Sequence, residues 1–210
     1  MDRKKVLARG LASVAAAVFA AFALGWQAKA NAVDEIARLA VLMEWKAGTI
    51  VADIGAGDGK YTFAASRRVG DLGKVYATEI DTKLVTKLQG EVAKRHLKNV
   101  QVEQSAEADT NLPAECCDAI FLRHVYHHLT KPAEFDAKLV RSLKPGGRLA
   151  IIDFPARSGL DRVEGVPSNR GGHGIPETIV IEELTAAGLQ VEKDVKNWDE
   201  DDYCVLFVRK

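Results

Sequence analysis

The chain has 210 residues, of which 47% are hydrophobic and 28% are charged. This composition suits one folded domain with a sizeable core, rather than a disordered or disulfide-stapled chain. Lysine plus arginine and aspartate plus glutamate both number 29, so no bulk electric field favours nucleic acid or an anionic membrane. Nucleic acid is therefore not expected as a partner.

The first 30 residues have the three-part layout of a secretory signal peptide. A basic cluster over 2–5 precedes an uncharged, alanine-rich run over 11–26, and residues 28–30 have the small-x-small form of a cleavage site. The run is short for a membrane-spanning helix, although flanking residues can help it to act as an anchor. We expect residues 1–30 to direct export or to anchor the chain in a membrane, with a cytoplasmic location left open. Residues 31–210 are expected to form the folded domain.

A glycine-rich turn follows the first predicted strand, which covers 49–54. The string over 53–59 reads D-x-G-x-G-x-G. Glycine lets the backbone turn sharply and approach a ligand closely. After a helix over 60–69 and a second strand over 73–80, Glu79 stands where a carboxylate can accept hydrogen bonds from ribose hydroxyls. This order is typical of an α/β protein that holds an adenosine-containing cofactor.

Two classes of cofactor site share this pattern. A dinucleotide fold has G-x-G-x-x-G, but Lys60 stands at the position of its last glycine. The string instead resembles motif I of the class I S-adenosylmethionine (SAM) dependent methyltransferases. An NAD-dependent oxidoreductase is the less favoured alternative. Further segments resemble the same family in the same order, at 104–107, 112–113, 117–122, 123–129 and 143–153.

The resemblance implies an α/β fold with a Rossmann-like, doubly wound, mostly parallel seven-stranded sheet and an antiparallel last strand. Strands 189–192 and 203–208 are joined by only about ten residues, which favours an antiparallel pair. The predicted helices cover 32–45, 60–69, 83–96, 131–144 and 176–187.

The resemblance also implies a reaction, the transfer of a methyl group from SAM to an unidentified small-molecule or protein acceptor. SAM is made inside cells, which conflicts with export of the chain. A non-catalytic SAM-binding or scaffold protein is therefore the second alternative.

The cofactor-binding residues follow from the same resemblance. Asp53 is expected at the methionine end of SAM, directly or through water, and Glu79 at the ribose. Ser105, Ala106 and Glu107 are expected to read the adenine edge, although the family usually has an acidic residue where Ser105 stands. The expected set is Asp53, Gly55, Ala56, Gly57, Gly59, Glu79, Ile80, Ser105, Ala106, Glu107 and Arg123.

Four candidate bases follow the fourth predicted strand: His124, Tyr126, His127 and His128. If residues 123–129 form a helix, His124 and His128 share one of its faces at i and i+4. Histidine titrates near neutral pH and can accept a proton, so both are catalytic candidates, with capping or packing as the alternative role. Arg123 has an ion pair as its alternative to cofactor binding. No third ligand stands near these histidines, so no metal site is expected.

Two other features of the sequence bear on function. The glycine- and proline-rich connection over 154–175 is long enough for a lid, and His173 within it either faces substrate or lies idle on a surface loop. Cys116, Cys117 and Cys204 show no C-x-x-C pair and no metal-type spacing. We expect them to act as small apolar residues rather than in a redox or metal role.

Overall fold

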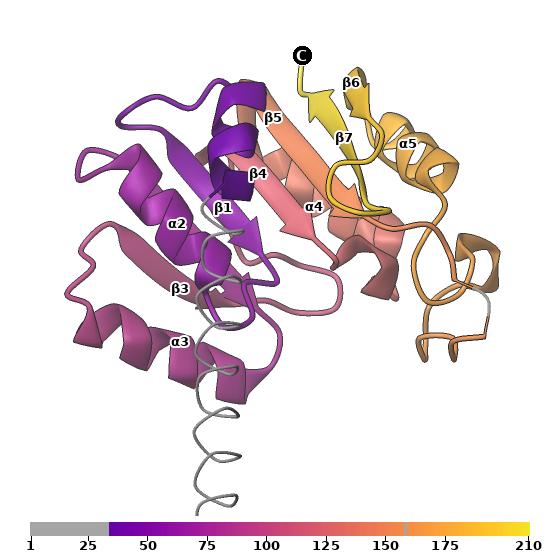
Figure 1. The fold of residues 1–210 in the computed structure, drawn as a ribbon, viewed down its shortest axis with the longest axis horizontal. Helices are drawn as coiled ribbons and strands as arrows, with labels where there is room; N and C mark the ends of the chain where they lie inside the picture. The colour runs from indigo at the N-terminus through magenta and orange to yellow at the C-terminus, as the bar shows by residue number, and fades with distance from the viewer. Residues whose placement is uncertain (1–33, 158) are drawn as a thin grey trace, which may run out of the picture.

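The computed structural model describes residues 34–157 and 159–210. These residues form one twisted sheet with helices on both faces (Figure 1). The signal-like segment over 1–30 lies outside the described residues. Among the helices that are described, none has the length and the apolar character to cross a membrane.

The sheet has seven strands in the order β3-β2-β1-β4-β5-β7-β6. Neighbours among the first five strands in this order pair in parallel, and β7 is antiparallel to both β5 and β6. The predicted fold class, including the reversed last strand, is confirmed. The strands are β1 (Ile50–Ile54), β2 (Lys74–Glu79), β3 (Val100–Gln104), β4 (Cys117–Arg123), β5 (Leu143–Asp153), β6 (Gln190–Val195) and β7 (Tyr203–Val208).

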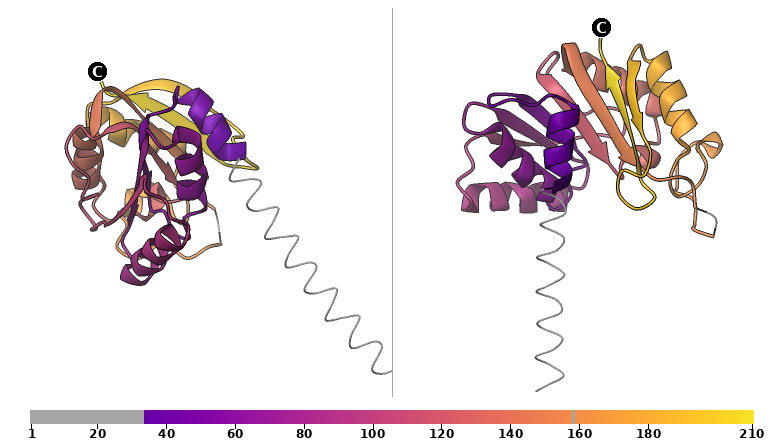
Figure 2. Two further views of the ribbon diagram at one scale, coloured as in Figure 1. Left: turned by 90° about the vertical axis from the view of Figure 1, so that its left-hand side faces the viewer. Right: turned by 45° about the horizontal axis from the view of Figure 1, so that its top comes forward.

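Helices occur in every segment where the sequence predicts one. The helix over 34–42 lies with α2 and α3 on one face of the sheet, while α4 and α5 cover the other (Figure 2). Asp81 starts α3, because its carboxylate accepts hydrogen bonds from the N–H groups of Lys83 and Leu84. Pro132 opens α4 in the first turn, where its missing N–H has no cost. The labelled helices are α2 (Lys60–Val69), α3 (Thr82–Lys94), α4 (Pro132–Ser142) and α5 (Glu177–Ala186), with short 3₁₀ turns η1 (Tyr126–His128) and η2 (Ser168–Arg170).

The two faces of the sheet bury alternate residues of the same strands. Val51 and Phe121 pack with Leu39 of the first helix, whereas Ala52 and Ile120 pack towards α4 and α5. A strand buried on both sides reads as a continuous apolar run, as β1 and β4 do. Each large side chain buried in this way contributes about 1.5–3 kcal/mol. The sheet is therefore a rigid base for the loops at its carboxyl edge.

The condition for a shared helical face of His124 and His128 is not met. Within residues 123–129 only Tyr126–His128 is helical, as a single 3₁₀ turn. His124 lies before that turn, in the left-handed region with φ 55°. His124 and His128 therefore do not share a helical face.

The cysteines differ in part from expectation. Cys117 and Cys204 are buried among apolar residues, as predicted. Cys116 and Cys117 are also joined by a disulfide, which the sequence did not predict. Adjacent cysteines do not have the C-x-x-C spacing, so that pattern gives no signal for this disulfide.

Candidate functional site

A pocket of about 450 Å³ opens at the carboxyl ends of the parallel strands. Ligands bind at that edge in open α/β sheets. Its lining includes the predicted cofactor residues that follow β1, β2 and β3, together with the turn that follows β4. The lining residues are Ile54, Gly55, Glu79, Ile80, Ser105, Ala106, Glu107, Val125, His128, Leu129, Thr130 and Phe135. Asp53, Ala56, Gly57, Gly59 and Arg123 are not in the lining.

Glu79 is the most firmly held polar group of the pocket. Its Oε2 accepts a hydrogen bond from the N–H of Gly57 at 3.0 Å, and its Oε1 accepts from the N–H groups of Ile80 at 2.8 Å and Asp81 at 3.2 Å. Only 7% of Glu79 is exposed, whereas Ile80 beside it is 52% exposed. The site therefore offers a fixed carboxylate next to an apolar surface, which suits the ribose and the base of a nucleoside.

The glycine-rich turn needs its glycines for different reasons. Gly55 has φ 72°, and a Cβ there would stand 2.4 Å from Cγ2 of Val125, so the turn passes directly against the pocket wall. Gly57 has φ 54° with open space around the position of a Cβ, so backbone conformation alone requires it. A Cβ on Gly59 would stand 2.4 Å from Cδ1 of Leu88, which allows α2 and α3 to pack closely. Ala56 is buried behind the turn.

Asp53 lies below the turn rather than in the pocket wall. It is 3% exposed, and its Oδ2 accepts a hydrogen bond from the hydroxyl of Thr62 at 2.6 Å. Burial raises the pKa of Asp53 to about 7, the Thr62 hydrogen bond opposes the rise, and the negative charge of Glu79 adds to it. In this structure Asp53 ties the end of β1 to the first turns of α2.

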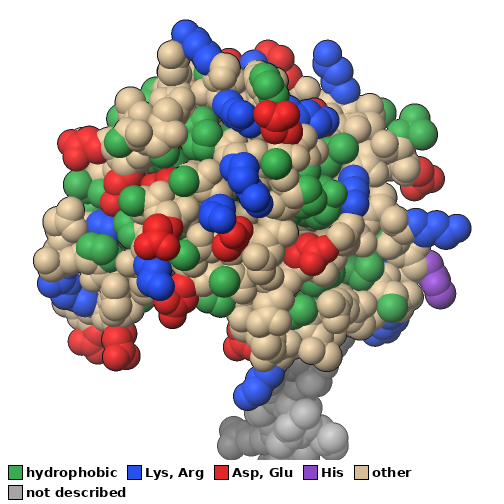
Figure 3. All heavy atoms as spheres, turned by 180° about the vertical axis from the view of Figure 1, so that it is seen from behind, with side chains coloured by type: hydrophobic (Ala, Val, Ile, Leu, Met, Phe, Trp, Pro, Cys, Tyr) green, Lys and Arg blue, Asp and Glu red, His purple; other side chains and the backbone are tan. Residues whose placement is uncertain are grey.

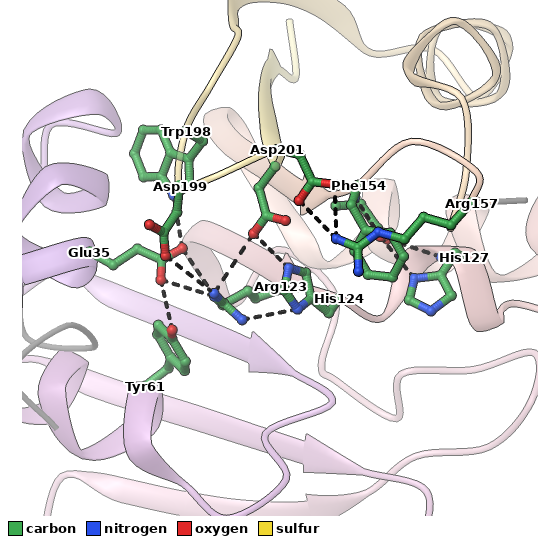
Figure 4. A network of polar contacts seen from close by, with 12 residues as sticks. Glu35, Tyr61, Arg123, His124, His127, Phe154, Arg157, Trp198, Asp199 and Asp201 are labelled. Carbon is green, nitrogen blue, oxygen red and sulfur yellow. Dashed lines mark hydrogen bonds and ion pairs between the residues drawn. The ribbon is translucent and has the colours of Figure 1, made fainter. Parts of the chain in front are cut away.

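Arg123 takes part in an ion-pair network on the side of the first helix (Figure 4). Its Nε donates to the two carboxylate oxygens of Glu35 at 3.1 and 2.9 Å. Glu35 also accepts hydrogen bonds from the hydroxyl of Tyr61 at 2.7 Å and from Nε1 of Trp198 at 2.8 Å. The ion-pair alternative for Arg123 is thus the arrangement present, and it fastens the helix over 34–42 to the loop before β7.

His124 belongs to the same network. Its Nδ1 lies 3.1 Å from Nη1 of Arg123, and its Nε2 lies 2.6 Å from Oδ2 of Asp202. Because arginine has only donors, Nδ1 of His124 is the acceptor, and Nε2 carries the ring proton and donates a hydrogen bond to Asp202. Both ring nitrogens are occupied, so His124 has no lone pair left for a substrate proton in this arrangement.

His128, the other predicted base, does line the pocket. Partial burial lowers its pKa, the neighbouring His127 and His173 lower it further, and Asp153 opposes them. His128 is therefore neutral near pH 7 and can accept a proton. Its place is compatible with the predicted role.

The structure also brings together His127, a candidate base that was not among the two catalytic residues expected, and Asp153, which was given no role. Nδ1 of His127 lies 2.8 Å from Oδ1 of Asp153, and the backbone N–H of His127 donates to Oδ2 of the same carboxylate at 3.2 Å. Asp153 ends β5, and His127 follows β4, the strand that pairs with β5. The one signal in the sequence for this contact was that both residues follow or end predicted strands that are neighbours in the parallel sheet.

The comparisons with known proteins agree with this geometry. Residues 52–151 match the family model described as "Methyltransferase domain". The crystal structure of a SAM dependent methyltransferase from Aquifex aeolicus is 32% identical, with a TM-score of 0.70, over 83% of this chain and 89% of its own. The chain belongs to the SAM-dependent methyltransferases.

Matches over part of the relative's length, or at lower identity, add detail to this assignment. A ubiquinone/menaquinone biosynthesis C-methyltransferase UbiE from Marinomonas sp. is 30% identical over 52% of this chain and 44% of its own length. The UbiE protein of Teredinibacter turnerae is 34% identical over 55% of this chain and 47% of its own length. The methyltransferase chain therefore spans about half the length of these relatives. The YcgJ protein from Bacillus subtilis covers 84% of this chain and 98% of its own, at 15% identity and a TM-score of 0.64, and supports the fold alone.

SAM is the cofactor of this methyltransferase family, and the pocket fits it. Binding sites for small ligands typically measure about 300–1,000 Å³, a range that includes this pocket. Glu79 would hold the ribose, while Ile80 and residues 105–107 would surround the base. The buried, three-times hydrogen-bonded carboxylate of Glu79 is the observation on which this fit depends.

Proposed function

We propose that this methyltransferase moves a methyl group from SAM to a small-molecule acceptor. The observation that carries the proposal is the pocket at the carboxyl edge, where a fixed acid and an apolar wall lie beside the turn with His128. When bound, SAM supplies a methyl group that is already electrophilic. The protein must then position the acceptor and exclude water, and positioning alone is worth about 7–11 kcal/mol.

The pocket wall suits that task. Ile54, Val125, Leu129 and Phe135 supply apolar surface on the side of β1, β4 and α4. An apolar wall keeps water away from the reacting carbon and strengthens the electrostatic contacts inside the site. Glu79 is the only carboxylate of the lining that is buried, since Glu107 is exposed.

For the acceptor we propose an electron-rich aromatic ring of the hydroquinone type, methylated on carbon. Two observations support this class. The UbiE relatives are named as C-methyltransferases of ubiquinone and menaquinone biosynthesis, although they match over about half their length. Beside the pocket, the rings of His127, His128, Phe154 and His173 lie with centroids 4.0–6.1 Å apart, and the exposed His128 and half-buried His173 offer ring surface to a planar acceptor.

A charged macromolecule is a less suitable acceptor. On the face seen in Figure 3, positive and negative side chains are interspersed, without a large area of one sign. Equal numbers of basic and acidic residues in the whole chain agree with this view.

The experiment is methyl transfer from radiolabelled SAM to 1,4-dihydroxynaphthalene, with NMR of the product to distinguish a C-methyl from an O-methyl group. Glu79→Ala is expected to abolish transfer by loss of the cofactor. Glu182→Ala, on the exposed side of α5, is the matched control. SAM binding without transfer to hydroquinones, phenols or thiols would favour a non-catalytic SAM-binding protein. Binding of NAD and not of SAM would favour an oxidoreductase.

A further inference from the structure

Next to the pocket lies a histidine whose position is set by a carboxylate. His127 is 2% exposed and Asp153 is fully buried. Asp153 accepts hydrogen bonds from the ring Nδ1 and from the backbone N–H of His127, so two contacts fix the imidazole relative to the carboxylate. A carboxylate on Nδ1 leaves Nε2 as the ring nitrogen with a lone pair when His127 is neutral.

Nε2 of His127 is the unusual feature of this pair. Within the described part of the chain, Nε2 of His127 is buried and has no hydrogen-bond partner. A buried polar atom without a partner costs about 1–3 kcal/mol. Such a cost is expected where a ligand completes the contact during function.

The surroundings of His127 show where a ligand would come from. Its ring centroid lies 4.0 Å from that of His128, which lines the pocket, and 4.9 Å from that of Phe154. The ring centroid of His173 lies 5.2 Å from that of His127. His173 has glycine on both sides, at 172 and 174, and belongs to the long connection between β5 and α5. His173 is half-buried, whereas His127 is buried, so His173 is the more accessible of these two rings.

We propose that His127, positioned by Asp153, accepts the proton that the acceptor loses during methyl transfer, with the acceptor ring taking the place of the His173 ring. This assignment rests on the proposed function. Nε2 takes the proton of a phenolic hydroxyl, whose electron pair moves into the ring. The ring carbon adjacent to the hydroxyl-bearing carbon forms a bond to the methyl carbon of SAM. The bond between that methyl carbon and sulfur breaks, and sulfur keeps its electron pair. The ring carbon then loses its hydrogen as a proton and the oxygen regains one, so one proton is released for each methyl group transferred.

His127 is better suited to this role than His124 or His128, the two histidines expected to be catalytic. Asp153 stabilises the imidazolium that forms on His127, as a carboxylate does in other base-and-orienter pairs. His128 faces the positive charge that His127 or His173 acquires on protonation, which opposes its own protonation. His124 already uses both ring nitrogens.

The first readout is binding rather than turnover. Protein labelled with ¹⁵N-histidine and saturated with S-adenosylhomocysteine is titrated with 1,4-dihydroxynaphthalene, and the ring nitrogens are followed by NMR. The proton of free His127 is expected on Nδ1, and the hydroquinone is expected to shift its Nε2 signal strongly. A titration that moves His128 and leaves Nε2 of His127 unchanged would overturn the assignment.

The second readout compares turnover with cofactor affinity. His127→Gln and Asp153→Asn are each expected to lower turnover by at least about 100-fold, in the range of general base catalysis, while SAM affinity stays within about twofold. His96→Asn, at the exposed end of α3, should change neither quantity. Transfer that persists in His127→Gln would overturn the role of His127 alone. A wild-type protein that binds SAM and methylates no hydroquinone would overturn the proposed acceptor class as well.

Discussion

The N–H of Gly57 donates a hydrogen bond to Oε2 of Glu79 at 3.0 Å, which joins the turn after β1 to the acid at the end of β2. The same carboxylate accepts the N–H groups of Ile80 and Asp81 through its other oxygen. Its orientation is therefore set before a cofactor arrives. A preformed acceptor loses little entropy when it binds a ribose.

The Glu79 carboxylate gives the first prediction. Glu79→Gln replaces one carboxylate oxygen, which accepts hydrogen bonds, by an amide NH2 group, which donates them. Because backbone N–H groups face this position, the side chain must lose its contacts either with the glycine-rich turn or with the ribose. We expect SAM affinity to fall by about 10- to 100-fold, since a charge-assisted hydrogen bond is worth about 1.5–3 kcal/mol. Calorimetric titration measures this, with Glu182→Gln as the control. Equal affinities for the two variants would show that Glu79 does not hold the cofactor.

The turn offers a matched pair of glycine substitutions. Gly55→Ala places a Cβ 2.4 Å from Cγ2 of Val125, whereas Gly57→Ala meets no atom within 4 Å, and both positions have positive φ. Each variant loses about 1–2 kcal/mol of stability from backbone strain. Only Gly55→Ala should also displace the pocket wall and weaken SAM binding by tenfold or more. Adding Val125→Ala should restore part of that loss, and a strictly additive double-mutant cycle would count against the contact.

His124 is predicted to stabilise the fold rather than to react. His124→Asn keeps a residue that tolerates the left-handed backbone at φ 55° but removes the link between Arg123 and Asp202. We expect the free energy of unfolding to fall by about 1–3 kcal/mol, with SAM affinity nearly unchanged. The control His96→Asn sits at a similar φ of 54° on the surface. Loss of turnover without loss of stability would assign His124 to catalysis after all.

The raised pKa of Asp53 predicts that the free energy of unfolding depends on pH. Its pKa is raised from 3.8 to about 7 in the folded protein, so the native state holds this proton more tightly than the unfolded chain does. The contribution of Asp53 to stability is greatest below about pH 4, declines as the pH rises to 7, and then stays constant. The full difference corresponds to at most about 4 kcal/mol.

Substitution by asparagine isolates that effect. Asp53→Asn retains an acceptor for Thr62 without a buried charge, so it should gain stability over the wild type at pH 8 and not at pH 4. Urea denaturation at the two pH values measures this, with Asp71→Asn on the surface as the control. The same stability difference at both pH values would contradict the raised pKa of Asp53.

The disulfide between the adjacent cysteines can be tested by mass spectrometry of the alkylated protein. The structure joins Cys116 to Cys117 and leaves Cys204 as a buried free thiol. In denaturant without reductant, iodoacetamide should modify Cys204 alone, and after reduction it should modify all three cysteines. Three labels before reduction would show that the pair is a dithiol.

Much of the fold was predictable because its signals are local. Residues 60–69 and 203–208 were predicted with the bounds that α2 and β7 have. The apolar pattern of each segment is local, and Gly59 and Gly70 flank α2. Glu79 was predictable because its position follows from a short motif. The seven-stranded order, in contrast, depended on resemblance to a family rather than on periodicity.

The contacts around His124 and His127 could not be predicted in the same way. His127 and Asp153 are 26 positions apart, and Glu35 and Trp198 are 163 apart, so only the folded sheet brings each pair together. The shared helical face that residues 123–129 would need for His124 and His128 is absent, because His124 takes a left-handed conformation in which its ring contacts both Arg123 and Asp202. Tertiary contacts overrode the local pattern there.

A crystal structure of the protein with S-adenosylhomocysteine is the most direct test of where the cofactor binds. We predict that both ribose hydroxyls lie within hydrogen-bond distance of the Glu79 carboxylate, with the adenine between Ile80 and residues 105–107. Ligand density outside this pocket, or a ribose that makes no contact with Glu79, would contradict the assigned site.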